Sequence, residues 1–270
     1  MIVEDSQIEI LINEVFEKYG LDFSGYSQAS FKRRVVRLIQ LDDYQNFYEF
    51  LYKVKTDSEY FTRFVEEITV NVTEMFRDPL FYKVLREKIL PQLGTKPFIR
   101  LWHAGCSTGE EVFSMAILLK ELNLLHKSLI YATDINGAVL EKAKKGIFPL
   151  QMMKQYSENY MVSGGNKDFS HYYTANYGLA KFEEDLLEKM VFSQHNLISD
   201  TSFNEFDLIL CRNVLIYFDK DLQDRALNLF NDSLANLGYL ALGTKETIKF
   251  SILKHRFSQV EKEKIWKKIR

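Results

Sequence analysis

Residues 102–113 read WHAGCSTGEEVF, and the Gly-x-Ser-x-Gly pattern inside this stretch is compatible with two kinds of chemistry. Ser107 could be the nucleophile of a serine hydrolase, presented on a sharp turn between a strand and a helix. Gly105 and Gly109 could instead form a turn that binds a nucleotide. Either chemistry needs a strand before the turn and a helix after it, so the flanking sequence alone does not choose between them.

The elements that must position this turn are predicted from the periodicity of the apolar residues. Before about residue 90 these residues recur at helical spacing, so that part is predicted to be all-α. Beyond it, strands are predicted over residues 98–102, 129–135, 190–194, 206–211 and 239–243, and helices over 111–122, 138–145 and 220–237. This alternation indicates an α/β fold with a doubly wound sheet. The stretch between Gly146 and Met190 breaks the alternation, and we expect it to be an insertion, either an antiparallel hairpin or a helical cap.

The composition excludes several function classes. The 270 residues are 46% hydrophobic, enough for a sizeable core, and a formal net charge of -2 gives no general attraction for nucleic acid. The N-terminal sequence has no basic leader and no apolar run is long enough to span a membrane, so we expect a cytoplasmic protein without membrane insertion. The histidines show no ligand spacing, which predicts no metal site, and Cys106 and Cys211 are predicted to be small buried residues.

The place of the glycine turn in the chain favours a nucleotide over hydrolase chemistry. An α/β-hydrolase has several strands before its nucleophile, whereas the sequence before residue 98 is predicted to be helical. The turn is therefore the first βα turn, where doubly wound folds bind nucleotides. Glu110 and Glu111 open the next helix, where they would repel a pyrophosphate and attract a cation. S-adenosylmethionine, with its ribose hydroxyls, ammonium and sulfonium, fits this turn better than NAD.

Asp134, at the end of the second predicted strand, supports the same ligand. An acidic side chain in that place can accept hydrogen bonds from both ribose hydroxyls. The alternative is that Asp134 caps the following helix, because Asp-x-Asn-Gly is typical of a turn.

Five motifs follow one another along nearly the whole chain: NVTEMFRD (71–78), WHAGCSTGEE (102–111), ATDI (132–135), NL (196–197) and FDLILCRNVLIYF (206–218). Together they resemble the chemotaxis receptor methyltransferases, the CheR family. The resemblance implies a Rossmann-like S-adenosylmethionine-dependent methyltransferase domain over residues 98–270, with an inserted subdomain over about 147–190. It also implies an α-helical N-terminal domain over 1–70 and a linker and cofactor-lid segment over 71–97. The implied activity is transfer of a methyl group to glutamate side chains on the cytoplasmic helices of chemoreceptors, with S-adenosylhomocysteine as the second product.

The resemblance also implies the site residues. Together with Gly105 of the glycine turn, the cofactor-binding residues are Asn71, Thr73, Arg77, Glu111, Asp134, Asn196, Leu197, Asn213 and Val214. Tyr217 would lie beside the reacting centre. At residues 243–246 the chain reads Gly-Thr-Lys-Glu where the family usually has Gly-His-Ser-Glu. Any role of that His-Ser pair is therefore not carried over to Thr244 and Lys245, and cofactor binding is not affected.

Arg77 and Tyr217 are the candidate catalytic residues. The Arg77 guanidinium matches an incoming glutamate carboxylate in bidentate geometry, although a salt bridge to Asp78 is the structural alternative. Tyr217 could donate a hydrogen bond near that carboxylate, or be an ordinary core aromatic residue.

A basic helix predicted over residues 27–40 is the candidate partner-binding surface. Arg33, Arg34 and Arg37 are predicted on the face opposite the apolar residues Phe31, Val35, Leu38 and Ile39. This face is complementary in sign to glutamate-rich receptor helices and is expected to be remote from the glycine turn. The alternatives are a solvated face or a contact with nucleic acid.

Two functions of other classes stay open, a serine hydrolase using Ser107 and a non-catalytic module that binds S-adenosylmethionine for signalling. The expected partner is the cytoplasmic domain of a chemoreceptor or a related signalling protein, and the enzyme is expected to be a monomer.

Overall fold

Helices at the N-terminus pack around a core of their own in the computed structural model, which describes residues 3–69 and 73–269. They are α1 (Asp5–Tyr19), α2 (Gln28–Leu41), α3 (Phe47–Thr56) and α4 (Ser58–Ile68). Side-chain caps help fix where they begin: Asn46 accepts a hydrogen bond from the Glu49 amide, and Asp57 accepts from the amides of Glu59 and Tyr60. The aromatic rings of Phe23, Phe31, Phe50 and Phe64 meet in this core.

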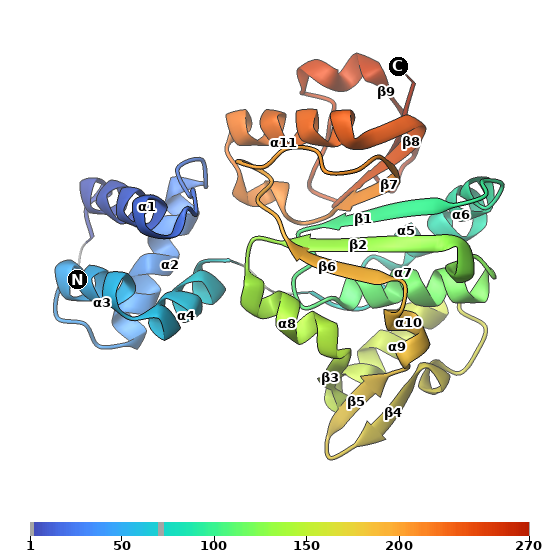
Figure 1. The fold of residues 1–270 in the computed structure, drawn as a ribbon, viewed down its shortest axis with the longest axis horizontal. Coiled ribbons are helices and arrows are strands. Elements are labelled where there is room, and N and C mark those ends of the chain that lie inside the picture. The colour runs from blue at the N-terminus through green and yellow to red at the C-terminus, as the bar shows by residue number, and fades with distance from the viewer. Residues whose placement is uncertain (1–2, 70–72, 270) are drawn as a thin grey trace.

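The rest of the described chain is built on a seven-stranded sheet in the order β6-β2-β1-β7-β8-β10-β9 (Figure 1). The strands are β1 (Ile99–Ala104), β2 (Ser128–Asp134), β6 (Met190–Gln194), β7 (Phe206–Cys211), β8 (Leu234–Leu242), β9 (Phe257–Glu261) and β10 (Ile265–Lys268). Strands β6, β2, β1, β7 and β8 are parallel, and β10 and β9 complete the sheet in antiparallel pairing. The chain starts at β1 in the middle and extends first to one side and then to the other, which confirms the doubly wound α/β fold.

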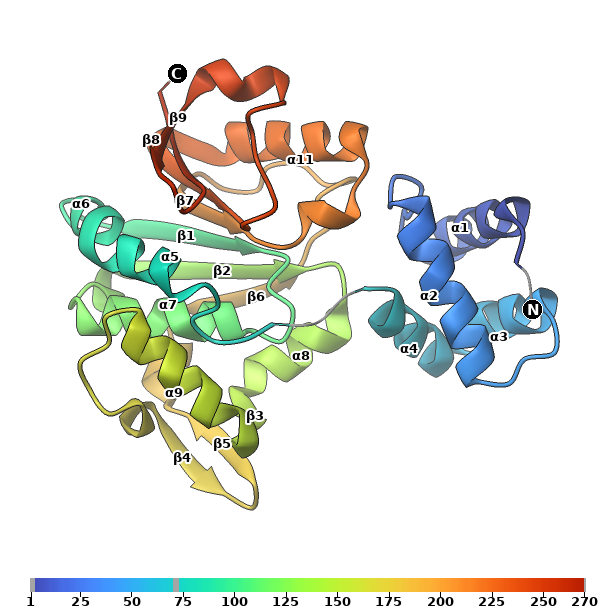
Figure 2. The same cartoon turned by 180° about the vertical axis from the view of Figure 1, so that it is seen from behind.

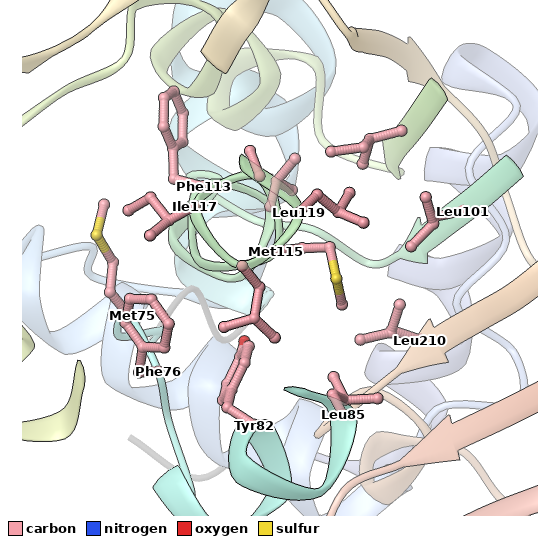
Figure 3. Packing of buried hydrophobic residues seen from close by; sticks show 14 of the residues in the cluster. Met75, Phe76, Tyr82, Leu85, Leu101, Phe113, Met115, Ile117, Leu119 and Leu210 are labelled. Carbon is pink, nitrogen blue, oxygen red and sulfur yellow. The ribbon is translucent and has the colours of Figure 1, made fainter. Parts of the chain in front are cut away.

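Helices cover both faces of this sheet. One face carries α5 (Pro79–Val84), the π-helical turn η1 (Leu85–Ile89), α6 (Leu90–Leu93) and α7 (Glu110–Glu121). Figure 3 shows Met115 of α7 facing Leu101 of β1 and Leu210 of β7, with Leu85 of η1 beside them. Residues 79–93 therefore belong to the main core, whereas the sequence predicted a linker and lid over the whole of 71–97.

The opposite face carries α11 (Lys220–Ser233), and this helix ends earlier than predicted. The helix was expected to continue to residue 237, but it stops at Ser233 and Leu234 already pairs with Phe206 in the sheet. Carbonyl oxygens at this end of the helix have a partner outside it. The Lys268 ammonium of β10 donates to the carbonyl oxygens of Asn231 and Leu234 at 2.7 and 2.8 Å.

The insertion contains both of the alternatives that were expected, a helix and antiparallel strands. Strands β3 (Ile147–Pro149), β4 (Tyr173–Asn176) and β5 (Leu179–Phe182) form a separate sheet in the order β3-β5-β4. Helix α9 (Met153–Val162) lies between β3 and β4 in the chain, α8 (Gly137–Lys145) precedes the insertion, and α10 (Glu184–Leu187) lies near its end. The Glu121 carboxylate at the end of α7 ties the insertion down, because it accepts hydrogen bonds from the hydroxyls of Tyr160 and Tyr172 and pairs with Arg86.

Short 3-10 turns complete the described fold: η2 (Leu125–Lys127), η3 (Leu150–Met152), η4 (Phe169–Tyr172), η5 (Leu215–Tyr217) and η6 (Ile252–Arg256). Cys106 and Cys211 are buried and free, as predicted. Within residues 3–69 and 73–269, no helix has the length and apolar character needed to cross a membrane.

The helical domain docks on the α/β domain through main-chain hydrogen bonds. The Ser27 amide donates to the Tyr217 carbonyl and the Asp219 amide donates to the Gly25 carbonyl, both at 2.9 Å. Tyr26 and Phe218 form a β-bridge between these two bonds. This approach is possible because residue 25 is glycine: a Cβ atom there would lie 2.1 Å from Cγ of Leu222 on α11.

Replacing Gly25 with alanine is therefore expected to lower the free energy of unfolding by about 1–3 kcal/mol, because either the Leu222 side chain or the backbone at residue 25 must move. Equilibrium denaturation measures the change. Gly137→Ala is the matched control, because its added methyl would meet only the Gln194 side chain at 3.9 Å. Equal stabilities of the two variants would show that the close approach at residue 25 carries no cost.

Candidate functional site

One cavity is lined by residues at the carboxyl ends of β1, β2, β6 and β7. These strand ends point toward the helical domain (Figures 1 and 2). The strand order changes direction between β1 and β7, and ligands of doubly wound folds bind outside such a switch point. The α/β domain contributes many lining residues, among them Thr73, Arg77, Gly105, Glu111, Asp134, Asn196, Leu197, Asn213, Val214 and Tyr217. Tyr26, Ile68 and Thr69 line it from the helical domain, and sequence reasoning missed them.

These lining residues include every predicted cofactor-binding residue that lies within the described ranges. The remaining one, Asn71, falls in residues 70–72 and lies outside them. Thr244 and Lys245 are exposed at the end of β8 and do not line the cavity. The departure from the family motif is therefore located away from the predicted cofactor contacts.

The glycine turn forms the floor of the cavity. Gly105 has φ of 79°, and a Cβ atom there would lie 2.5 Å from Cγ2 of Val214, so both conformation and space require glycine. The amides of Gly105 and Cys106 both donate to the Thr133 carbonyl, at 2.8 and 2.9 Å. The turn is thereby fixed to the end of β2.

Asp134 connects the glycine turn to the next loop. Its Oδ2 accepts from the Ser107 amide and its Oδ1 from the Asn136 amide, both at 2.9 Å. Asn136, not Asp134, caps α8, because its side chain accepts from the Ala138 amide, so the cap alternative for Asp134 is wrong. Burial raises the pKa of the Asp134 carboxyl, and these two amides oppose that shift.

The loop after β6 supplies an amide donor. Asn196 uses its Oδ1 to accept from the Ile198 amide at 2.9 Å, which fixes the orientation of the side chain. Its Nδ2 is buried and has no hydrogen-bond partner among the described residues. A buried donor of this kind in a cavity wall needs an acceptor, and a ligand can supply it.

Glu246 shapes the opposite wall, and sequence reasoning did not single it out. Its Oε2 accepts from the amides of Gly243 and Asn213 at 2.6 and 3.0 Å, and its Oε1 accepts from the Ile216 amide at 3.3 Å. Asn213 has φ of 62°, which the carboxylate holds in place. The glutamate retained at position 246 beside the altered Thr244 and Lys245 was the signal available in the sequence.

Glu111 is the acid of α7 that faces the cavity. It accepts from His103 at 3.0 Å through Oε1 and pairs with Arg212 at 2.9 Å through Oε2. Burial acts to raise its pKa, but the hydrogen bond from His103 and the charge of Arg212 outweigh burial and hold the pKa below its ordinary value. His103 and Arg212 thus keep the largely buried Glu111 carboxylate in its anionic form.

Glu110 does not face the cavity, so the prediction that both glutamates attract a cation holds for Glu111 alone. Its side chain is buried away from the cavity and accepts from the Thr108 hydroxyl at 2.6 Å. Burial raises the pKa of Glu110 to about 7, against the hydrogen bond from Thr108. The attraction for a cation therefore depends on Glu111.

The raised pKa of Glu110 predicts a pH dependence of stability. The folded state holds this proton up to about pH 7, whereas the ordinary pKa is 4.5, so the stabilisation is complete below the ordinary pKa and is lost as pH rises through 7. We expect the wild type to lose on the order of 1–3 kcal/mol relative to Glu110→Gln between pH 5 and pH 8. Denaturant unfolding of both proteins across that range measures it, and parallel curves would contradict the assignment.

The two candidate catalytic residues both line the cavity. Asp78, the alternative partner considered for Arg77, pairs with Arg212 at 2.6 Å. Tyr217 is half-buried, and burial raises its pKa against the charges of Arg34 and Arg77. It is a residue of the cavity wall and of the domain contact, not an aromatic of the deep core.

The three arginines of the basic face of α2 have different surroundings. The apolar face is buried as predicted, and Arg33 and Arg37 are exposed. The Arg34 guanidinium, however, lies 5.9 Å from the ring centre of Tyr217 and donates to the Glu67 carbonyl at 3.3 Å. Arg34 therefore contacts a residue that lines the cavity, although the arginine itself belongs to the helical domain and does not line the cavity.

The hydrolase alternative finds no support. In the described chain β1 is the first strand of the main sheet, so the strands that should precede a hydrolase nucleophile are absent there. The Ser107 amide donates to the Asp134 carboxylate, so the residue is part of the turn that connects β1 to the end of β2.

Fold and site together define an S-adenosylmethionine-dependent methyltransferase: a doubly wound sheet, a glycine turn, an acid at the end of β2 and a cavity at the switch point. Family models agree with this class. The CheR methyltransferase SAM-binding domain matches residues 71–266, and the CheR methyltransferase all-alpha domain matches residues 6–69. The chain belongs to the CheR methyltransferase family.

Individual relatives are similar over nearly the whole chain. A Pseudomonas putida relative called Cher3 is 46% identical over 265 residues, 98% of this chain and 97% of the relative. The chemotaxis protein methyltransferase of Borreliella burgdorferi is 30% identical, over 92% of this chain and 90% of the relative. That of Salmonella typhimurium is 29% identical, over 96% and 88%.

Proposed function

We propose that this protein transfers the methyl group of S-adenosylmethionine to glutamate side chains in the cytoplasmic domain of a chemoreceptor or a related signalling protein. The products are glutamate methyl esters and S-adenosylhomocysteine, and the role is adaptation in chemotaxis. The observation that carries the proposal is a cavity whose lining combines the predicted cofactor residues of the described ranges with Arg77 and Tyr217. The names of the Borreliella and Salmonella relatives, both chemotaxis protein methyltransferases, support the same role.

The donors and acceptors of the cavity fit this cofactor. We assign the Asp134 carboxylate to the ribose hydroxyls, because it lines the cavity and its two oxygens are held in position by the amides of Ser107 and Asn136. The unpaired Nδ2 of Asn196 suits an acceptor nitrogen of an adenine ring. The anionic Glu111 suits an ammonium group. Thr73, Leu197, Asn213, Val214 and Gly105 supply the remaining walls, and Asn71 is assigned by motif alone.

The chemistry requires alignment more than proton transfer. When bound, the cofactor supplies a methyl group on a positively charged sulfur. A glutamate side chain is already an anion at neutral pH, so no general base is needed. Holding the two groups in line can lower the barrier by roughly 7–11 kcal/mol. We assign Arg77 to hold the incoming carboxylate and Tyr217 to donate a hydrogen bond to it, because both residues line the cavity.

The partner and setting follow from the same proposal. The exposed Arg33 and Arg37 suit an acidic helix of the partner, and Arg34 extends this surface to the cavity rim. Receptor cytoplasmic domains place the enzyme in the cytoplasm, and we propose that it acts there as a monomer.

The test is methyl transfer from S-adenosylmethionine with a labelled methyl group to a purified receptor cytoplasmic fragment. Glutamate esters release labelled methanol in mild base, whereas methylated amines do not. A fragment with its acceptor glutamates changed to alanine is the matched control. Tight cofactor binding without transfer to any fragment would favour the non-catalytic binding module instead.

A further inference from the structure

Arg212 joins two parts of the cavity that are far apart in the sequence. Its side chain is 2% exposed, and its Nη1 pairs with Glu111 of α7 at 2.9 Å. Its Nη2 donates to the Asp78 carboxylate at 2.6 Å and to the Arg77 carbonyl at 3.2 Å. The guanidinium carbon lies 4.1 Å from the ring centre of Phe81. One planar cation therefore contacts both the proposed cofactor carboxylate and the turn that carries Arg77.

The turn that Arg212 contacts has an unusual backbone. Phe76 and Asp78, on either side of Arg77, have φ of 53° and 58°, a left-handed conformation that costs free energy for residues with side chains. The Ser114 hydroxyl of α7 accepts from the Phe76 amide at 2.9 Å on one side. Arg212 binds the carbonyl of Arg77 and the side chain of Asp78 on the other. Such a turn persists only where its surroundings hold it.

We infer that Arg212 is a positioning residue for methyl transfer: its two nitrogens set Glu111 for the cofactor and hold the Arg77 turn in its left-handed conformation. This inference rests on the roles proposed above for Glu111 and Arg77. An arginine suits the task because its planar fork can reach both segments at once while one face stacks on an aromatic ring. A lysine ammonium is a point charge on a flexible stem and does not reproduce that fork.

The Glu111 half of the inference is tested by cofactor affinity, which needs no methyl acceptor. Calorimetric titration with S-adenosylmethionine is expected to show roughly a 10-fold or greater rise in Kd for Arg212→Lys, and a similar rise for Glu111→Gln. The double variant should be little weaker than either single one, because both remove the same arrangement. Fully additive losses would overturn this half, since Arg212 would then not act through Glu111.

The Arg77 half is tested with Asp78→Asn, which leaves the buried guanidinium and Glu111 in place. Asp78 is 37% exposed at its side chain, so this variant is expected to fold even if Arg212→Lys does not. Amide hydrogen exchange over residues 73–80 should become roughly 10-fold faster or more, with Kd for the cofactor nearly unchanged. With a receptor fragment, kcat should fall while the cofactor KM stays within a few-fold.

Unchanged exchange and unchanged kcat in Asp78→Asn would overturn the Arg77 half. The outcomes are separable from failure of the proposed function: a wild type that binds cofactor but methylates no receptor fragment refutes the substrate, whereas the titration and exchange results still decide the role of Arg212.

Discussion

Asp134→Ala is expected to weaken S-adenosylmethionine binding by about 1–3 kcal/mol, a rise in Kd of roughly 5- to 150-fold. Two losses combine in this variant. The ribose hydroxyls lose a charged acceptor, and the amides of Ser107 and Asn136 lose the carboxylate that fixes the loops around the cavity. Isothermal titration calorimetry on a variant with a native circular dichroism spectrum measures the effect.

Asp134→Asn separates the two losses. The amide keeps one oxygen acceptor and nearly the same shape, but it carries no charge and must turn its NH₂ toward one of the two backbone donors. It is therefore expected to bind the cofactor more weakly than the wild type. Affinity within twofold of wild type for a folded Asp134→Ala would refute the ribose contact.

Much of the fold could be predicted from local pattern. The strand Phe206–Cys211 lies where its apolar run placed it, because a buried parallel strand is a short continuous apolar run. Met190–Gln194 was also predicted correctly, although it lies at the edge of the sheet and is partly exposed. The prediction for residues 220–237 was partly wrong because Phe230, Leu234 and Leu237 keep a helical spacing beyond the true end at Ser233. At that end Leu234 pairs with Phe206, and the Asn231 carbonyl accepts from Lys268; both partners lie far from this end of the helix in the sequence.

For the site, too, local features could be predicted from the sequence and contacts between distant segments could not. Residues inside a contiguous motif, such as Gly105 or Asp134, could be assigned because the motif fixes their place at a strand end. Arg212 lies inside the motif at residues 206–218, yet its partners Glu111 and Asp78 come from other segments. The contact of Arg34 with Tyr217 depends on how the two domains dock, and this cannot be predicted from the spacing of apolar residues within either domain.

Reversing the charge of the exposed arginines, Arg33→Glu with Arg37→Glu, is expected to raise the KM for the receptor fragment sharply. Like charges facing each other across an interface cost on the order of a few kcal/mol. The cofactor Kd should stay unchanged, because neither side chain lines the cavity. Arg34 is left intact here, since its contact with Tyr217 would mix partner binding with a change at the cavity.

Initial rates of methyl transfer over a salt series measure both parts of this prediction. Wild-type KM should rise with salt, because charges at an exposed interface are screened beyond a Debye length of about 8 Å at physiological ionic strength. The variant should show a flatter or opposite slope. Lys254→Glu with Arg256→Glu is the matched control: it makes the same change in net charge at exposed positions on η6. Equal KM values and salt slopes in the two double variants would show that Arg33 and Arg37 form a solvated face, because only the overall charge of the protein would then matter.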